Sequence, residues 1–298
     1  MKNDITIEQI IKLNKTFQNN SVTYSPLNGG FSNETYVAKI NQNKYVIKIN
    51  INQSSYLRLG RVQECLAQQK AAALGIAPKV ISYPEDARYI ISEFFDGHTM
   101  TYDEIVNKNI LRLVEIIKSI HSIKGVNRQC SCFDLIDRYT KGISKFKVSI
   151  PDGYYDILKK TDIIRNRRAQ DHINNSKYAH NDILSNNILF DGQKIIIIDW
   201  ELSGLGDPFM DLASLAYSNW MTKEQEQLML TGYFGYCDQK LFDTLQDIKY
   251  VGMVREVVWA LFFEGLNKKS VNHNINYREA GLYALNRIKN GYNTLWGD

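Results

Sequence analysis

Residues 180–213 read HNDILSNNILFDGQKIIIIDWELSGLGDPFMDLA, and the order of apolar and polar residues in this stretch decides the fold. Two apolar runs, 187–190 and 194–198, flank an Asp-Gly turn signal and therefore predict a β-hairpin. The hairpin would bring Asn187, at its start, close to Asp199, directly after its end. Polar side chains at one end of an apolar hairpin indicate a functional site.

The acid and amide side chains of this stretch are of the types that phosphoryl transfer requires. A γ-phosphoryl group moves to a hydroxyl with the help of a carboxylate that orients the hydroxyl and takes its proton, and of oxygen ligands for Mg²⁺ on the phosphates. Asp182 would be that carboxylate, and Asn187 and Asp199 would be the ligands. Alternatively, all three are ordinary turn and strand-end residues. The apolar strand before Asp199 favours the functional interpretation, because a buried strand that ends on a carboxylate needs a cation or several donors there.

A second hairpin is predicted near the start of the chain. Residues 24–34 form a loop with two adjacent glycines, and the alternating runs 35–40 and 44–49 follow it. Such a loop could fold over nucleotide phosphates and present backbone N–H groups to them. A Gly-Gly pair by itself is more often a plain turn.

Lys48 lies within the second run of this hairpin, in the context YVIKI. Kinases place the cation that binds the α- and β-phosphates in this kind of pattern. A helix is predicted over residues 61–73, with Gly75 as its stop signal, and Glu64 on that helix is the candidate ion-pair partner of Lys48. A solvent-facing strand lysine and a solvated helix glutamate are the alternatives.

These motifs resemble those of the aminoglycoside phosphotransferase and choline kinase superfamily, small-molecule kinases that share the protein-kinase fold. The similarity covers most of the chain and is strongest over residues 178–215. It is carried by His180-Asn181-Asp182 with Asn187, by the IDWE sequence at 198–201 and by residues 207–213. Within the superfamily, the chain is most similar to bacterial choline kinases.

The resemblance implies an α+β, bilobal protein-kinase-like fold. Residues 79–95 predict a further hairpin whose end, at Glu93, would offer backbone groups to an adenine edge. Residues 1–95 would form a small nucleotide-binding lobe with an antiparallel sheet. Residues 96–298 would form a larger, mainly helical lobe with the catalytic loop and the substrate site.

The resemblance also assigns roles to individual residues. His180 would brace the catalytic loop beside Asp182, and Asp211 would tie the backbone of that loop, although an N-cap role for Asp211 would leave the same sequence pattern. Asn187 and Asp199 would hold Mg²⁺. The residues expected to bind ATP are Lys48, Glu64, Gly29, Gly30, Ser32, Asn33 and Glu93.

The substrate site is less clearly marked. Trp259, Phe262 and Trp220 could form an aromatic wall for a quaternary ammonium, although aromatic residues at helical spacing are more often core. Glu201 could contact a second metal ion or the substrate. Choline kinases tend to carry a tyrosine where this chain has Leu202, and an acidic residue near Ser218 or Asn219. Both departures weaken the case for choline and leave the phosphoryl-transfer residues intact.

The composition is compatible with such an enzyme. The chain has 298 residues, of which 44% are hydrophobic and 23% charged, and its formal net charge is +4. The mild charge without a block of like charges indicates neither nucleic acid nor membrane as a partner. The start of the chain is polar and lacks an apolar signal core, so we expect a cytoplasmic protein. Four scattered cysteines indicate reduced thiols.

Together these features predict an ATP- and Mg²⁺-dependent kinase that phosphorylates an alcohol on a small cationic molecule, with choline or ethanolamine as the leading candidates. Thiamine kinase and aminoglycoside phosphotransferase are the alternative enzymes. An inactive nucleotide-binding scaffold is the alternative of a different class. We expect a monomer or a homodimer.

Overall fold

The computed structural model describes residues 5–27, 33–50, 60–171, 176–267 and 276–290. The chain divides into two compact units, which are described separately. The first comprises residues 1–100, 125–128 and 186–202, and the second comprises 101–124, 129–185 and 203–298. The predicted lobe boundary at residue 95 stays a prediction.

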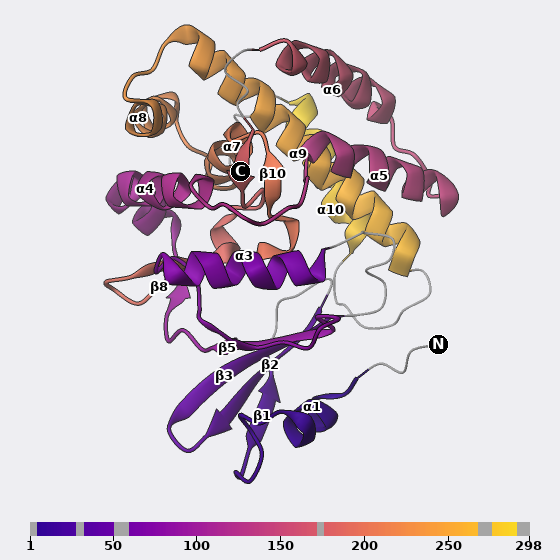
Figure 1. Ribbon diagram of the computed structural model, residues 1–298. Coiled ribbons are helices and arrows are strands. Elements are labelled where there is room, and N and C mark those ends of the chain that lie inside the picture. Colours follow the sequence, from indigo (N-terminus) through magenta and orange to yellow (C-terminus); the bar gives the residue numbers. More distant parts are fainter. Residues whose placement is uncertain (1–4, 28–32, 51–59, 172–175, 268–275, 291–298) are drawn as a thin grey trace. The chain divides into compact units, whose positions relative to one another are not determined.

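The first unit is built on a five-stranded antiparallel sheet in the order β1-β2-β3-β5-β4 (Figure 1). The predicted hairpins at its centre and edge are present, and its strands are β1 (Thr23–Pro26), β2 (Asn33–Ile40), β3 (Asn43–Asn50), β4 (Val80–Ser82) and β5 (Tyr89–Glu93). A smaller antiparallel sheet in the same unit has the order β6-β8-β9, with strands β6 (His98–Thr99), β8 (Ile188–Phe190) and β9 (Ile195–Ile197).

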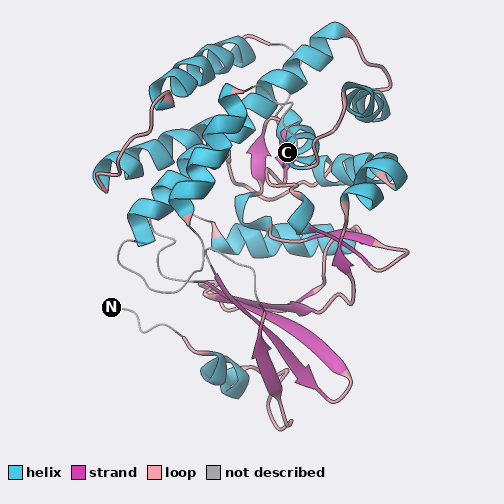
Figure 2. Ribbon diagram, turned by 180° about the vertical axis from the view of Figure 1, so that it is seen from behind, coloured by secondary structure: helices cyan, strands magenta, loops and turns pink. Residues whose placement is uncertain are grey.

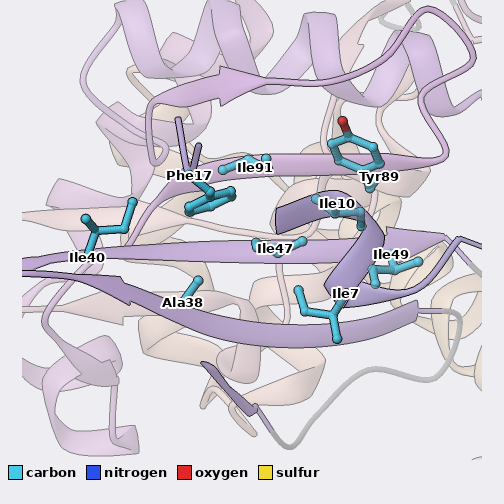
Figure 3. Packing of buried hydrophobic residues seen from close by; sticks show 9 residues of the cluster. All are labelled: Ile7, Ile10, Phe17, Ala38, Ile40, Ile47, Ile49, Tyr89 and Ile91. Atoms are coloured by element: carbon cyan, nitrogen blue, oxygen red, sulfur yellow. The ribbon is translucent and has the colours of Figure 1, made fainter. Parts of the chain in front are cut away.

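One face of the five-stranded sheet is covered by helix α1 (Ile7–Leu13). Ile7 and Ile10 of α1 pack with Ile47 and Ile49 of β3, and Figure 3 shows this cluster. The period-two alternation of strand side chains places Ile47 and Ile49 on this face and Lys48 on the other. The sequence pattern of β3 therefore directs its lysine away from the apolar core.

The opposite face of the sheet is covered by helix α3 (Arg61–Ala73). Cys65 of α3 packs with Ile90 of β5, and Ile90 lies directly opposite Lys48 in the strand register. Residues directly opposite each other in antiparallel strands share a face, so Lys48 lies on the side of the sheet that α3 covers. Helix α3 ends before Gly75, whose φ of 77° is in the left-handed region that glycine tolerates.

The second unit is mainly helical, as the cyan ribbons in Figure 2 show. Its long helix α9 (Gln239–Asn267) packs against several other helices of the unit. Those partners and the remaining helices are α4 (Ile110–His121), α5 (Cys132–Lys145), α6 (Tyr154–Ala169), α7 (Phe209–Ser218), α8 (Lys223–Phe234) and α10 (Tyr277–Lys289). Strands β7 (Lys177–Ala179) and β10 (Gly204–Gly206) form a two-stranded antiparallel sheet.

Two helical stretches are interrupted or ended at an asparagine. Helix α1 ends at Leu13, because Asn14 leaves the helical conformation with a ψ of 127°. The stretch 103–122 consists of a π-helix η1 (Asp103–Lys108) and α4, which are separated at Asn109. Within the described residues, no helix combines the length and apolar character needed to cross a membrane.

Candidate active site

Lys48 of the first unit contacts two carboxylates. Its Nζ lies 2.8 Å from Oε1 of Glu64 and 2.6 Å from Oδ1 of Asp199. The exposed fractions are 16% for the Lys48 side chain and 4% for that of Glu64, so this ion pair is largely removed from water. The pair that the sequence predicted between strand and helix is therefore present, and Asp199 joins it.

The end of the β8–β9 hairpin places Asp199 there. The Ile198 N–H donates to the Asn187 carbonyl over 3.0 Å, so Asn187 and Asp199 lie at the same end of the hairpin, as predicted. The side chain of Asn187 is buried. Asp199 has a φ of 66°, a left-handed conformation that aspartate adopts more readily than most residues. The hairpin thus turns sharply after its last apolar residue and directs this carboxylate toward Lys48.

Arg61 is a second cation of this cluster, and the sequence prediction missed it. Its Nη1 donates to Oε2 of Glu64 and to Oε2 of Glu201, both over 2.9 Å. Asn33 also donates to Oε2 of Glu201, over 3.1 Å. The spacing of Arg61 three residues before Glu64 on a helix is the signal that could have identified it. Glu201, expected to contact a second metal ion or the substrate, accepts hydrogen bonds from both Arg61 and Asn33.

The carboxylates of this cluster could hold a metal ion. One oxygen each of Glu64, Asp199 and Glu201 lie within 4.8 Å of one another. Carboxylate and amide oxygens are the protein ligands that Mg²⁺ prefers, so these groups and Asn187 fit that ion.

The cluster combines three carboxylates, those of Glu64, Asp199 and Glu201, with two cations, Lys48 and Arg61, which leaves one negative charge in excess. Burial lowers the pKa of Lys48, but Asp199, Glu64 and Glu201 more than compensate, and the pKa lies above its ordinary value. Burial raises the pKa of Asp199, while the charge of Lys48 acts in the opposite direction. Lys48 therefore stays protonated and can bind an anion such as a phosphate.

The segment His180-Asn181-Asp182 lies in the second unit and is held by Asp211. Its carboxylate accepts the backbone N–H groups of His180 over 2.9 Å and of Asn181 over 2.6 Å. Nε2 of His121 lies 3.1 Å from the same carboxylate. Pro208 is the N-cap residue of α7, so the N-cap interpretation of Asp211 is wrong. The buried side chain of His180 fits a bracing role better than proton transfer.

Asp182 contacts a residue that the sequence analysis did not identify. Nη2 of Arg255, on α9, lies 2.7 Å from Oδ1 of Asp182. The Asp182 side chain is 18% exposed and that of Arg255 is 4% exposed. The sequence signal was the adjacent charged pair Arg255-Glu256 within a mainly apolar helical run. Asp182 belongs to the second unit and Asn187 and Asp199 to the first, so their predicted convergence stays a prediction.

Two of the three aromatic residues proposed for the substrate wall pack against other side chains of the second unit. Phe262 is 2% exposed and packs between Tyr139 and Phe146, so its assignment to a substrate wall is wrong. The guanidinium of Arg287 lies 3.7 Å from the centroid of the Trp220 ring. It therefore covers one face of that ring. Packing within the helical unit accounts for both.

Trp259 remains a candidate for the substrate wall. It is half-buried, and its ring lies 5.0 Å from that of Phe263 and 5.8 Å from that of Tyr277.

The nucleotide-loop residues Gly29, Gly30 and Ser32 lie outside the described residues. Glu93 is exposed, and its backbone N–H donates to the Lys79 carbonyl over 2.9 Å. An adenine contact by Glu93 would therefore have to use its carbonyl oxygen.

Comparison with known proteins relates this geometry to a family. A family model described as the phosphotransferase enzyme family matches residues 23–247. Protein LicA of Haemophilus influenzae is 23% identical over 286 residues, which cover 92% of this chain and 80% of that protein.

Solved structures show the same fold. A choline/ethanolamine kinase family protein from Mesorhizobium loti has a TM-score of 0.77 and 22% identity, with 96% of this chain and 93% of the other covered. The choline kinase LicA from Streptococcus pneumoniae has a TM-score of 0.74 and 21% identity, with 90% and 92% covered.

The match covers most of the chain, which therefore belongs to the phosphotransferase enzyme family. It is a phosphotransferase with an alcohol group as acceptor, as the resemblance predicted. The predicted α+β, bilobal protein-kinase-like fold class is confirmed by the structural neighbours and by the antiparallel sheet and helices of the two units.

Proposed function

We propose that this enzyme transfers the γ-phosphoryl group of ATP to the alcohol of a small cationic molecule, with choline as the first candidate and ethanolamine as the second. The observation that carries the proposal is the contact of Lys48 with both Glu64 and Asp199. A protonated lysine held by a helix glutamate next to a candidate metal-binding aspartate fits the binding of nucleotide phosphates.

Each unit contributes separate groups to this reaction. In the first unit, Lys48 binds phosphate oxygens, and Asn187 and Asp199 would hold Mg²⁺, which would neutralise charge on the phosphates. Glu201 lies with Glu64 and Asp199, which supports a contact with the metal ion. In the second unit, Asp182 orients the acceptor hydroxyl and takes its proton.

The acceptor preference rests on the similar proteins and on one aromatic side chain. The relatives include proteins named as choline and choline/ethanolamine kinases, and Trp259 is a half-buried aromatic residue that suits a quaternary ammonium. A cation over such a ring contributes roughly 0.5 to 2 kcal/mol, depending on how far it is removed from water. With Phe262 in the core, the wall has fewer members than the sequence suggested.

The test is ADP release by the purified protein with ATP and Mg²⁺, measured against choline, ethanolamine, thiamine and kanamycin. We expect the highest kcat/KM for choline. A clear preference for thiamine or kanamycin would change the proposed acceptor and leave the proposed phosphoryl-transfer reaction unchanged. Failure to bind ATP together with no turnover of any acceptor would refute the proposal and favour a scaffold.

A further inference from the structure

The guanidinium of Arg255 contacts the catalytic-loop segment at two successive residues. Its Nη1 donates to the backbone carbonyl of Asn181, and its Nη2 donates to Oδ1 of Asp182 over 2.7 Å. Arg255, Asn181 and Asp182 all belong to the second unit. One planar guanidinium group thus contacts both the Asn181 peptide group and the Asp182 carboxylate that follows it.

Arg255 is itself held in place by its neighbours. Its Nη2 lies 2.9 Å from Oε1 of Glu256 and 3.2 Å from the hydroxyl of Tyr217, and that hydroxyl donates to the same Glu256 oxygen. The two N–H groups of Nη2 can therefore serve Asp182 and Glu256 together. Burial lowers the pKa of Arg255, but Tyr217, Asp182 and Glu256 outweigh it, so the pKa is raised and the group stays charged.

The backbone before Asp182 is constrained from two helices. Asn181 has a φ of 64°, a left-handed conformation that the surroundings must maintain. Asp211 of α7 accepts the N–H groups of His180 and Asn181, and Arg255 of α9 donates to the Asn181 carbonyl.

We propose that Arg255 is a positioning residue for phosphoryl transfer, which fixes the Asp182 carboxylate in the orientation that receives the acceptor hydroxyl. The inference rests on the proposed function, because it takes Asp182 as the catalytic carboxylate. It also explains why a buried arginine lies on α9. A lysine offers one ammonium in place of a planar fork and could not hold both groups in the same geometry.

The expected effect is on turnover and not on nucleotide binding. Misplacement of a catalytic group by about 1 Å can lower a rate by about 10²-fold, so Arg255→Ala should lower kcat by about that factor and leave the KM for ATP nearly unchanged. Arg255→Lys should recover part of the loss. Added guanidinium should raise the kcat of Arg255→Ala and leave Arg255→Lys unaffected.

A control variant separates positioning from stability. Lys249 also lies on α9, is 6% exposed and pairs with Glu226. Lys249→Ala should therefore remove a comparably buried charge from the same helix. We expect it to lower stability, to leave the kcat of the folded fraction unchanged and to show no response to guanidinium.

A double-mutant cycle provides the decisive test. If Arg255 acts through Asp182, Arg255→Ala should lower kcat less than about threefold in an Asp182→Ala background, since residues that act as a unit are not additive. The inference would be overturned if the double variant lost kcat by the product of the two single-variant factors. It would also be overturned if Arg255→Ala kept the wild-type kcat.

Stability measurements keep the inference testable if the reaction itself has been misassigned. The free energy of unfolding should be measured for the wild type, Arg255→Ala, Asp182→Ala and the double variant. The losses of the two single variants should not add up to the loss of the double variant, because the two side chains are in contact. Additive values would overturn the inference without reference to turnover. A wild-type enzyme that turns over none of the four acceptors would instead refute the proposed function.

Discussion

Nζ of Lys48 lies 2.6 Å from Oδ1 of Asp199, a residue 151 positions later in the chain. The contact joins the large sheet of the first unit to the hairpin formed by β8 and β9. Because Glu64 holds the same ammonium group, Lys48 is fixed from the side of α3 as well.

Replacement of Lys48 should impair both nucleotide binding and turnover. Lys48→Met removes the cation that we assign to the phosphates and leaves Glu64 and Asp199 without their shared partner. We expect kcat/KM for ATP to fall by about 10²-fold or more. Steady-state kinetics will measure the loss. Lys44→Met is the matched control, because Lys44 lies on the same strand, is partly exposed and pairs with Asp96; an equal loss in that control would contradict the assignment.

Replacement of Asp182 should abolish phosphoryl transfer while ATP still binds. Loss of a positioned general base costs typically 10² to 10⁴-fold in rate, so Asp182→Ala should fall in about that range. Isothermal titration with a non-hydrolysable ATP analogue should give a Kd close to that of the wild type. An Ala variant with normal turnover would remove Asp182 from its role. Asp191→Ala, in the exposed hairpin turn, serves as the control.

The metal requirement should depend on Asp199. We expect chelation of divalent ions to stop turnover and added Mg²⁺ to restore it. Asp199→Asn keeps the size of the side chain but removes one negative charge from the ligand set, so half-maximal activity should require several-fold more Mg²⁺. A titration of activity against Mg²⁺ concentration measures the change, and an unaltered midpoint would exclude Asp199 as a ligand.

Trp259 should affect the acceptor and not the nucleotide. Trp259→Ala removes a ring face worth roughly 0.5 to 2 kcal/mol to a bound cation, which corresponds to about a two- to thirtyfold rise in the KM for choline. The KM for ATP should change little. Kinetics with each substrate varied in turn will distinguish this outcome from a purely structural tryptophan, for which both constants would change together.

Phe262 should behave as a core residue. It fills the space beside Gly142, where any added Cβ would lie 2.3 Å from its ring. Phe262→Ala should lower the free energy of unfolding by about 3 to 5 kcal/mol, because it leaves a cavity in the core. Denaturant titration measures this value. A variant of normal stability with a raised KM for choline would restore Phe262 to the substrate wall.

The sequence by itself determined the local parts of this protein. The hairpin that carries Asn187 and Asp199 follows from two apolar runs and an Asp-Gly turn, and the alternation in β3 places Lys48 on the face opposite Ile47. Glu64 could be chosen as the partner of Lys48 because helix α3 begins just before it. The hairpin and the strand face could be predicted because each depends on residues near one another in sequence, whereas the choice of Glu64 relied on the kinase pattern.

Only the tertiary structure decided which distant side chains meet. Arg255 lies 73 residues after Asp182, and its contact with that carboxylate depends on how α9 packs within the second unit. The same packing places Phe262 in the core. Its spacing from Trp259 along the helix was equally compatible with a core position and with a substrate wall. Helical periodicity defines an apolar face but not the element that covers it, because the energy of burial depends on area and shape and is not directional.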